Sequence, residues 1–290
     1  MRRAATPHTL YRVDSHFLDS IRRALAPWCV ICGVERGDPV CPGCLEDFLP
    51  EDVRRCRRCA NRLPASPDPA VENSVHDPVG NSRILVDEPV EKSAISGENH
   101  VDIPGDFPVD HVVDLCGGCL VRRRHFDATV ALADYAAPIS GMIAALKFQG
   151  RLDLGHAFGR LLARRAARRP GRGCDALIPI PVAPQRLRGR GYNQAEEIAR
   201  AAAAGLGLPV LARHLIRNRD GPAQHDLPLA QRRTGIRGAF ALRMPVPGSI
   251  RCVALVDDVM TSGSTLDEAA GVLKRAGVER VVNLVVARTP

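Results

Sequence analysis

The chain has 290 residues, of which 45% are hydrophobic and 25% are charged, and its formal net charge is +8. This balance is typical of a soluble globular protein and excludes collagen-like, low-complexity and wholly disordered chains. The length favours two domains. No run of 18 apolar residues occurs, so we expect no membrane insertion.

The first 28 residues contain five arginines but no continuous apolar core, so they do not predict a secretory signal. Residues 16–27 mix apolar and basic positions with the spacing of an amphipathic helix. We therefore expect a cytoplasmic protein with a helix ahead of its first cysteine.

The next segment is rich in cysteine. Eight of the ten cysteines form four Cys-x-x-Cys pairs, namely Cys29/Cys32, Cys41/Cys44, Cys56/Cys59 and Cys116/Cys119. In a reducing cytosol such pairs are more typical of metal ligands than of disulfides. A structural zinc ion takes four ligands, so the pairs predict one or two structural Zn²⁺ ions.

The spacing leaves the grouping of these pairs open. A sequential pairing places the first two pairs on one ion and the last two on another, and a crossed pairing is equally compatible with the spacing. Some pairs could instead be vestigial or only buffer redox conditions. The remaining cysteines, Cys174 and Cys252, have apolar neighbours and are expected in the core.

Segment 60–115 separates the third cysteine pair from the fourth. It contains eleven acidic residues, three basic residues and seven prolines, without a helical or strand period. This composition predicts a disordered acidic insertion. The insertion carries a net charge of −8, so the rest of the chain carries +16. Such a basic body attracts nucleic acid or phosphorylated small molecules, and the charge does not distinguish between them.

From residue 122 onward, strand-like and helix-like stretches alternate. Strands are expected at 127–135, 175–181, 252–256 and 281–286, and helices at 138–148, 154–167, 194–204 and 264–276. This alternation predicts an α/β domain over 122–290 with a mostly parallel sheet. Residues 1–121 would then form a separate zinc-ribbon-like domain.

The string VALVDDVMTSGSTL at 253–266 carries the sharpest functional signal. Two acids, Asp257 and Asp258, follow the apolar part of the expected strand, where open α/β sheets bind ligands. A small, hydroxyl-rich loop then leads into a helix and would expose backbone N–H groups to an anion. Its residues are Thr261, Ser262, Gly263, Ser264 and Thr265. The string therefore predicts a site for a phosphorylated ribose; the alternative is an ordinary capped turn beside a solvated Asp-Asp pair.

The same string resembles the 5-phosphoribosyl-1-diphosphate (PRPP) motif of type I phosphoribosyltransferases. The cysteine pairs, the LKFQG segment at 146–150 and the RGYNQ segment at 190–194 narrow the resemblance to the ComF family of competence-associated proteins. The likeness extends over 17–59 and 116–290, which is nearly the whole chain outside the insertion.

This resemblance implies a type I phosphoribosyltransferase-like fold and a set of ligand contacts. Asp257 and Asp258 would meet the ribose hydroxyls with Mg²⁺ nearby, and 261–265 would hold the 5-phosphate. Residues 179–182 would form the pyrophosphate loop and 218–238 a hood over the ligand. Arg190 and Asn193 of the RGYNQ segment join the expected substrate-binding residues.

Lys147 is a further candidate, because an ammonium group at this position could neutralise the diphosphate; the alternative is a solvated helix end. No residue stands out as a general base, and the acceptor cannot be read from the sequence. The expected activity is transfer of a phosphoribosyl group from PRPP with release of pyrophosphate. The alternative is a protein that binds single-stranded DNA with little or no catalysis; the basic body favours it, and the 4% aromatic content argues against extensive base stacking.

Overall fold

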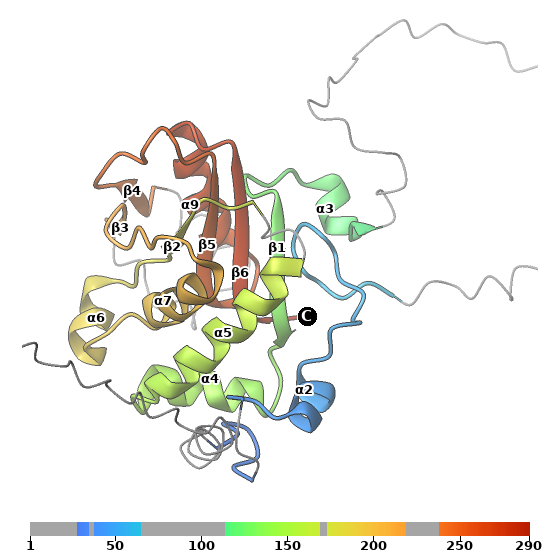
Figure 1. The fold of residues 1–290 in the computed structure, drawn as a ribbon. Helices are drawn as coiled ribbons and strands as arrows, with labels where there is room; N and C mark the ends of the chain where they lie inside the picture. Colours follow the sequence, from blue (N-terminus) through green and yellow to red (C-terminus); the bar gives the residue numbers. More distant parts are fainter. Residues whose placement is uncertain (1–27, 35–37, 65–113, 169–172, 219–237) are drawn as a thin grey trace, which may run out of the picture.

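The computed structural model describes residues 28–34, 38–64, 114–168, 173–218 and 238–290 (Figure 1). The helix expected at 16–27 lies outside these residues. So do most of the expected insertion and most of the expected hood, at 65–113 and 219–237. Among the helices that are described, none is long and apolar enough to cross a lipid bilayer.

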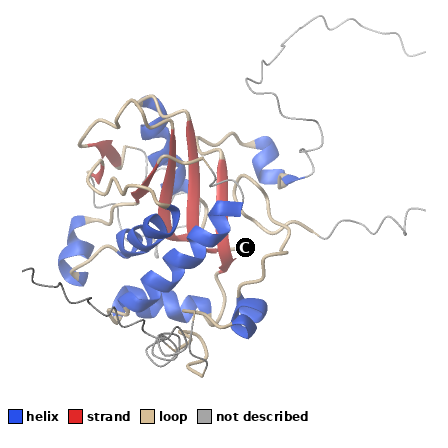
Figure 2. Cartoon of the chain, in the orientation of Figure 1, coloured by secondary structure: helices blue, strands red, loops and turns tan. Residues whose placement is uncertain are grey.

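A four-stranded parallel sheet forms the centre of the molecule (Figure 2). Its spatial order is β1–β6–β5–β2. The strands are β1 (Ala128–Asp134), β2 (Ala176–Pro179), β5 (Cys252–Met260) and β6 (Arg280–Arg288). Most of their residues are buried, as expected for a parallel sheet covered on both faces. The predicted mostly parallel α/β fold is therefore confirmed.

Helices cover both faces of this sheet (Figure 1). One face carries α4 (Ile139–Phe148), α5 (Leu152–Arg168) and α7 (Gln194–Leu206), and the other carries α9 (Ser264–Arg275). All four helices match the sequence prediction to within two residues at each end. Helices α5 and α7 approach closely because Gly159 has no side chain; a Cβ there would lie 2.4 Å from the carbonyl oxygen of Ile198.

Strand β5 is longer than the sequence predicted. We expected it to end at Val256, but it continues to Met260 because β6 runs beside it and pairs with Asp257, Val259 and Met260. The two acids therefore lie inside the strand instead of following it. Five short elements were not predicted: α2 (Pro42–Phe48), α3 (Gly117–Val121), α6 (Pro184–Arg190), and the antiparallel pair β3 (Leu215–Arg217) and β4 (Phe240–Leu242).

The two cysteine-bearing segments pack on opposite faces of the sheet. Buried side chains form two hydrophobic clusters, and alternate residues of β5 contribute to each. Cys29, Cys41 and Cys44 belong to the cluster beneath α4, α5 and α7. Cys56, Cys59 and Cys119 belong to the cluster that includes α9. The N-terminal segment thus shares both cores with the α/β domain, and the division at residue 121 stays a prediction.

Arg165 of α5 fastens the link between the two cysteine-bearing segments to the edge strand β1. Its guanidinium donates hydrogen bonds to the carbonyl oxygens of Leu49 and Pro50, at 2.7 and 3.2 Å. It also donates to the carbonyl oxygens of Ala131 and Leu132 in β1, at 3.0 and 2.7 Å. Burial lowers the pKa of Arg165. The chain therefore passes from one face of the sheet to the other over a half-buried cation.

Candidate functional site

The two acids of β5 lie at the carboxyl edge of the sheet, where the sequence placed the site. Asp258 is only 4% exposed, and its Oδ2 lies 3.1 Å from Nζ of Lys147 at the end of α4. Its backbone N–H donates to Oδ1 of Asp257 at 2.9 Å. Asp258 meets the end of α4, and the half-buried Asp257 lies beside it in the strand. The structure thus joins three of the predicted residues, Lys147 among them.

The carboxyl group of Asp257 is perturbed by its surroundings. Burial and then the negative charge of Asp258 raise its pKa, while Lys147 and Arg217 act in the opposite direction, and the resulting pKa is about 7. A carboxyl group in this state exchanges its proton near neutral pH. Perturbed acids in a cleft are a recurrent property of functional sites.

The loop at 261–265 joins β5 to the N-terminus of α9. Gly263 has a φ of +74° and directly precedes the helix; a Cβ there would lie 2.5 Å from Cε of Met260. Ser262 Oγ lies 2.8 Å from Ser264 Oγ and accepts a hydrogen bond from the backbone N–H of Ser264 at 3.3 Å. The first N–H groups of α9 and these hydroxyls form a positive, donor-rich end that suits a phosphate.

Two residues that the sequence analysis missed hold this loop in place. Arg124 donates from Nη2 to the carbonyl oxygen of Ser262 at 3.1 Å. Asp267, in the first turn of α9, is buried and accepts a hydrogen bond from the backbone N–H of His125 at 2.7 Å. The acid in the first turn of a predicted helix was a usable signal for Asp267. Arg124 gave no such signal, because arginine is common throughout this chain.

The RGYNQ segment connects the loop after β2 with α4 and α7. Asn193 caps α7 by accepting from the backbone N–H of Ala195 at 3.1 Å, and donates to the carbonyl oxygen of Ile180 at 3.0 Å. Tyr192 donates from its hydroxyl to the carbonyl oxygen of Leu146. The guanidinium of Arg190 lies 5.3 Å from the centroid of the Phe148 ring and bonds to Gln194. In the described structure these side chains position the expected pyrophosphate loop against the helix that carries Lys147.

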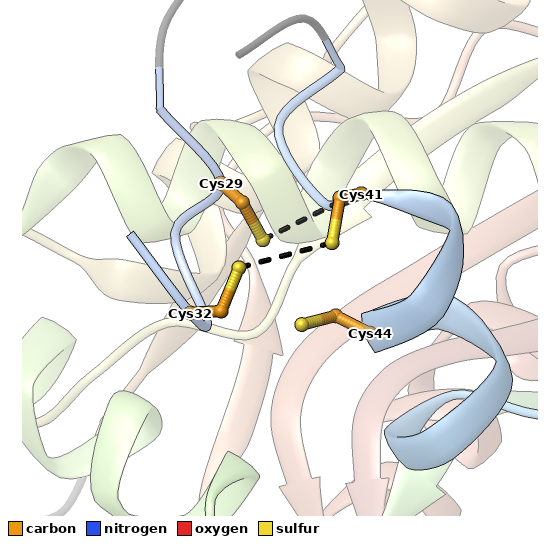
Figure 3. Close-up of side chains that lie close together, drawn as sticks. All are labelled: Cys29, Cys32, Cys41 and Cys44. Carbon is orange, nitrogen blue, oxygen red and sulfur yellow. Dashed lines mark hydrogen bonds between the residues drawn. The ribbon is translucent and has the colours of Figure 1, made fainter. Parts of the chain in front are cut away.

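The first cysteine group consists of Cys29, Cys32, Cys41 and Cys44, whose sulfur atoms all lie within 4.8 Å of one another. Figure 3 shows two of them on one turn and two at the start of α2, with the four sulfur atoms gathered together. The sulfur atoms of Cys32 and Cys41 are 3.8 Å apart. A tetrahedron of thiolates about 2.3 Å from a zinc ion has edges of about 3.8 Å, so this group fits the ion.

The second cysteine group consists of Cys56, Cys59, Cys116 and Cys119, also within 4.8 Å of one another. Cys59 and Cys116 have sulfur atoms 3.5 Å apart. The two groups follow the sequential pairing and not the crossed one. Cys174 and Cys252 lie outside both groups and are buried, as expected.

The thiols within each group hold one another in different protonation states. Burial alone raises the pKa of Cys29, but N–H groups of the backbone at Cys32 and Cys41 bring it down to about 6. Burial, followed by hydrogen bonding with its neighbours, raises the pKa of Cys44. Crowded thiols therefore cannot all ionise by themselves. A divalent cation removes this conflict because it stabilises every thiolate at once.

No family model matches the chain. The DNA utilization protein YhgH of Escherichia coli O157:H7 is 34% identical over 187 residues, which cover 63% of this chain and 82% of that protein. Competence protein F of Haemophilus influenzae is 35% identical over 171 residues, covering 57% of this chain and 75% of that protein.

Solved structures give a weaker likeness. Glutamine PRPP amidotransferase of B. subtilis, complexed with ADP and GMP, has 23% identity and a TM-score of 0.31, over 44% of this chain and 26% of that chain. Purine phosphoribosyltransferase of Pyrococcus horikoshii has 16% identity and a TM-score of 0.28, over 56% of this chain and 88% of that chain. At these TM-scores the likeness carries no argument about the site.

Proposed function

The chain belongs to the ComF family of competence-associated proteins, and on that premise we propose that it binds PRPP at the carboxyl edge of its sheet. The observation that carries this proposal is the continuous unit formed by β5, the 261–265 loop and the N-terminus of α9. Two carboxylates and an anion-binding helix end lie on this one unit. A ligand that fits both has hydroxyl groups and a phosphate close together, as a phosphorylated ribose does.

The proposed roles follow from the chemistry of each group. Asp257 and Asp258 accept hydrogen bonds from the ribose hydroxyls, and the backbone N–H groups and hydroxyls of 261–265 hold the 5-phosphate. Lys147 offers an ammonium group to the diphosphate, from its position beside Asp258. Asn193 positions the loop after β2 through the carbonyl oxygen of Ile180.

The acids also fit Mg²⁺, which accompanies PRPP in the enzymes that the chain resembles. Oδ2 of Asp258 is buried and makes no hydrogen bond within the described residues, although the charge of Lys147 is nearby. Carboxylate oxygens are the ligands that this hard cation prefers. When bound, Mg²⁺ would neutralise charge on the diphosphate.

If turnover occurs, it transfers the phosphoribosyl group to a nucleophile and releases pyrophosphate. The chain would contribute positioning of the ribose and stabilisation of the charge that develops on the leaving diphosphate. Residues 218–238 would cover the ligand and exclude water. No feature of the described residues identifies the acceptor, so the acceptor stays open.

The second candidate function is binding of single-stranded DNA. Arg186 and Arg188 of α6 are exposed, and neither guanidinium has an ion-pair or hydrogen-bond partner among the described residues. Free arginines of this kind bind backbone phosphates. The printed names of the relatives refer to DNA utilization and competence.

The two cysteine groups complete the proposal as structural zinc sites. Four thiolates leave no open coordination position, so the ions would stabilise the fold and take no part in chemistry. The proposal places the protein in the cytoplasm, where thiols stay reduced and available to metal.

Calorimetric titration with Mg²⁺ and PRPP tests the main proposal. We expect the wild type to bind PRPP and the double variant Asp257→Asn/Asp258→Asn to lose most of this affinity. Asp38→Asn, a change at an exposed acid that pairs with Arg164, is the matched control and should bind as the wild type does. Absence of binding by the wild type would refute the proposal.

Two further measurements separate the remaining possibilities. Release of pyrophosphate from PRPP, screened with a panel of amines and nucleobases, distinguishes an enzyme from a protein that only binds. A gel shift with single-stranded DNA at several salt concentrations tests the second function. Binding through phosphates must weaken as salt rises, so a response that is flat in salt argues against it.

A further inference from the structure

A cavity of about 360 Å³ adjoins the proposed ribose site. Lys147 connects the two, because it pairs with Asp258 and also lines the cavity. The other main lining residues are Phe148, Arg186, Arg190 and Tyr192. The volume falls within the range of about 300–1,000 Å³ that is usual for small-molecule sites. The roles proposed above use Lys147 for the diphosphate and Arg186 for DNA phosphates, Arg190 is an expected substrate contact, and none of these roles uses the ring of Phe148.

Phe148 is the last residue of α4, and its aromatic ring is exposed to solvent. The residue is 77% exposed, although a large apolar side chain gains free energy from burial. Arg190 lies over the ring at 5.3 Å from its centroid, and its bond to Gln194 fixes the guanidinium. The guanidinium lies over one face of the ring, while much of the rest of its surface stays accessible. This is the arrangement of a stacking platform.

The charged side chains that line the cavity are all cationic. Lys147, Arg186 and Arg190 line it, and no carboxylate does so among the described residues. The guanidinium of Arg186 is exposed and forms no ion pair or hydrogen bond within the described part of the chain. A free guanidinium offers two parallel N–H donors to a phosphate. The ligand that suits this cavity is both aromatic and anionic.

We propose that the cavity binds a nucleoside phosphate, with the base stacked on Phe148 and the phosphate on Arg186. This chemistry has two possible sources, a free nucleotide and a nucleotide unit within a single strand. PRPP has no aromatic group, so the proposal goes beyond the PRPP site and does not depend on it. If the source is a strand, the cavity gives the second candidate function its binding surface.

The test uses two probes on the full-length wild-type protein: AMP in equilibrium dialysis, and a fluorescent 20-nucleotide oligo(dT) in fluorescence anisotropy. We expect Phe148→Ala to weaken binding of the preferred probe about 5- to 150-fold, the loss expected for one stacked base. Phe148→Trp keeps an aromatic face and should retain binding. Because the ring is exposed, neither substitution should alter the thermal melt.

Arg186→Glu tests the phosphate contact, and Arg168→Glu is its control. Both change an exposed arginine to an acid, but Arg168 lies on α5 and pairs with Glu51. Arg186→Glu should weaken binding strongly, whereas Arg168→Glu should change it only by the general effect of charge. If Phe148→Ala and Arg186→Glu weaken the binding of AMP, the cavity is assigned to free nucleotides. If they weaken only the binding of oligo(dT), the cavity is assigned to a nucleic-acid strand.

Three results would overturn the proposal: no binding of either probe by the wild type, binding by Phe148→Ala that equals the wild type, or equal losses in the two arginine variants. Titration of PRPP on the same samples keeps the two proposals apart. Phe148→Ala should still bind PRPP. A wild type that binds a nucleotide through Phe148 but does not bind PRPP would refute only the PRPP site.

Discussion

Replacing Arg165 by alanine would test how the cysteine-bearing segment is fastened to the sheet. The guanidinium donates to the carbonyl oxygens of residues 49 and 50 on one side and of residues 131 and 132 in β1 on the other. Alanine removes all four donors and leaves the carbonyl groups without this partner. We expect a large loss of stability, because both segments lose their common anchor.

The magnitude follows from the number of bonds and from the cost of burying the cation. A hydrogen bond to a charged group contributes about 1.5–3 kcal/mol. Four such bonds overstate the total, because the guanidinium of Arg165 gives up hydration, as its lowered pKa shows. The substitution leaves neutral carbonyl groups behind, and each one that finds no new partner costs about 1–3 kcal/mol. Because Arg165 is only half-buried and water can reach part of this site, we expect a total loss of about 3–5 kcal/mol. At about 2–4 °C for each kcal/mol, Tm should fall by about 6–20 °C.

Arg168→Ala is the matched control, one turn further along the same helix. Its side chain is 68% exposed and pairs with Glu51, whose side chain is 58% exposed. Such surface pairs contribute less than about 1 kcal/mol. Urea unfolding followed by circular dichroism measures both variants. Equal free energies of unfolding for Arg165→Ala and Arg168→Ala would show that the four carbonyl bonds do not hold the segment.

Three other predictions follow from the structure. Elemental analysis should find two zinc ions per chain, one fewer in Cys44→Ser and no fewer in Cys174→Ser; less than one ion in the wild type would contradict the cysteine groups. Gly263→Ala should lower the free energy of unfolding by about 1–2 kcal/mol, because residue 263 has a positive φ. It should also bind phosphate more weakly in calorimetry, because the new Cβ forces Met260 to move. Gly277→Ala is the control: its φ is +94° and a Cβ there meets no atom within 4 Å, so this variant should lose stability without any change in phosphate binding. Asp257→Asn should match the wild type below about pH 4 and become the more stable protein in urea as the pH rises through about 7, because the raised pKa makes ionisation costly in the folded state; a difference that does not vary with pH would refute this.

The elements that follow from local pattern were predictable. The four helices and the order of strands along the chain depend on runs of apolar residues and on helix periods, which a single sequence contains. The end of β5 was not predictable in the same way. The sequence predicts that the strand ends before its two adjacent acids, and only the pairing with Val285 and Ala287 of β6 shows that it continues.

In the candidate site, too, residues that are contiguous in the sequence were predictable, and contacts between distant residues were not. Asp257, Asp258 and the 261–265 loop are contiguous, so the sequence contains their whole spacing. The contact of Lys147 with Asp258 spans more than one hundred residues and depends on how α4 packs. Arg124 and Arg165 act through backbone carbonyl groups far away in the chain. A sequence pattern carries no record of such bonds, because any residue can supply a carbonyl oxygen.

The second cysteine group is connected to the 261–265 loop from two sides. Arg288 donates from Nε to the carbonyl oxygen of Cys59 at 3.0 Å and from Nη1 to that of Met260, directly before the loop, at 3.3 Å. On the other side, Arg124 follows Cys119 by five residues and donates to the carbonyl oxygen of Ser262. The loop therefore lies between two arginine contacts, those of Arg288 and Arg124, and both arginines are linked to the same cysteine group. A metal ion that fixes Cys59 relative to Cys119 also fixes these two contacts relative to each other. If zinc occupies this group as proposed, a coordinatively closed ion would in this way shape the proposed anion site without touching it.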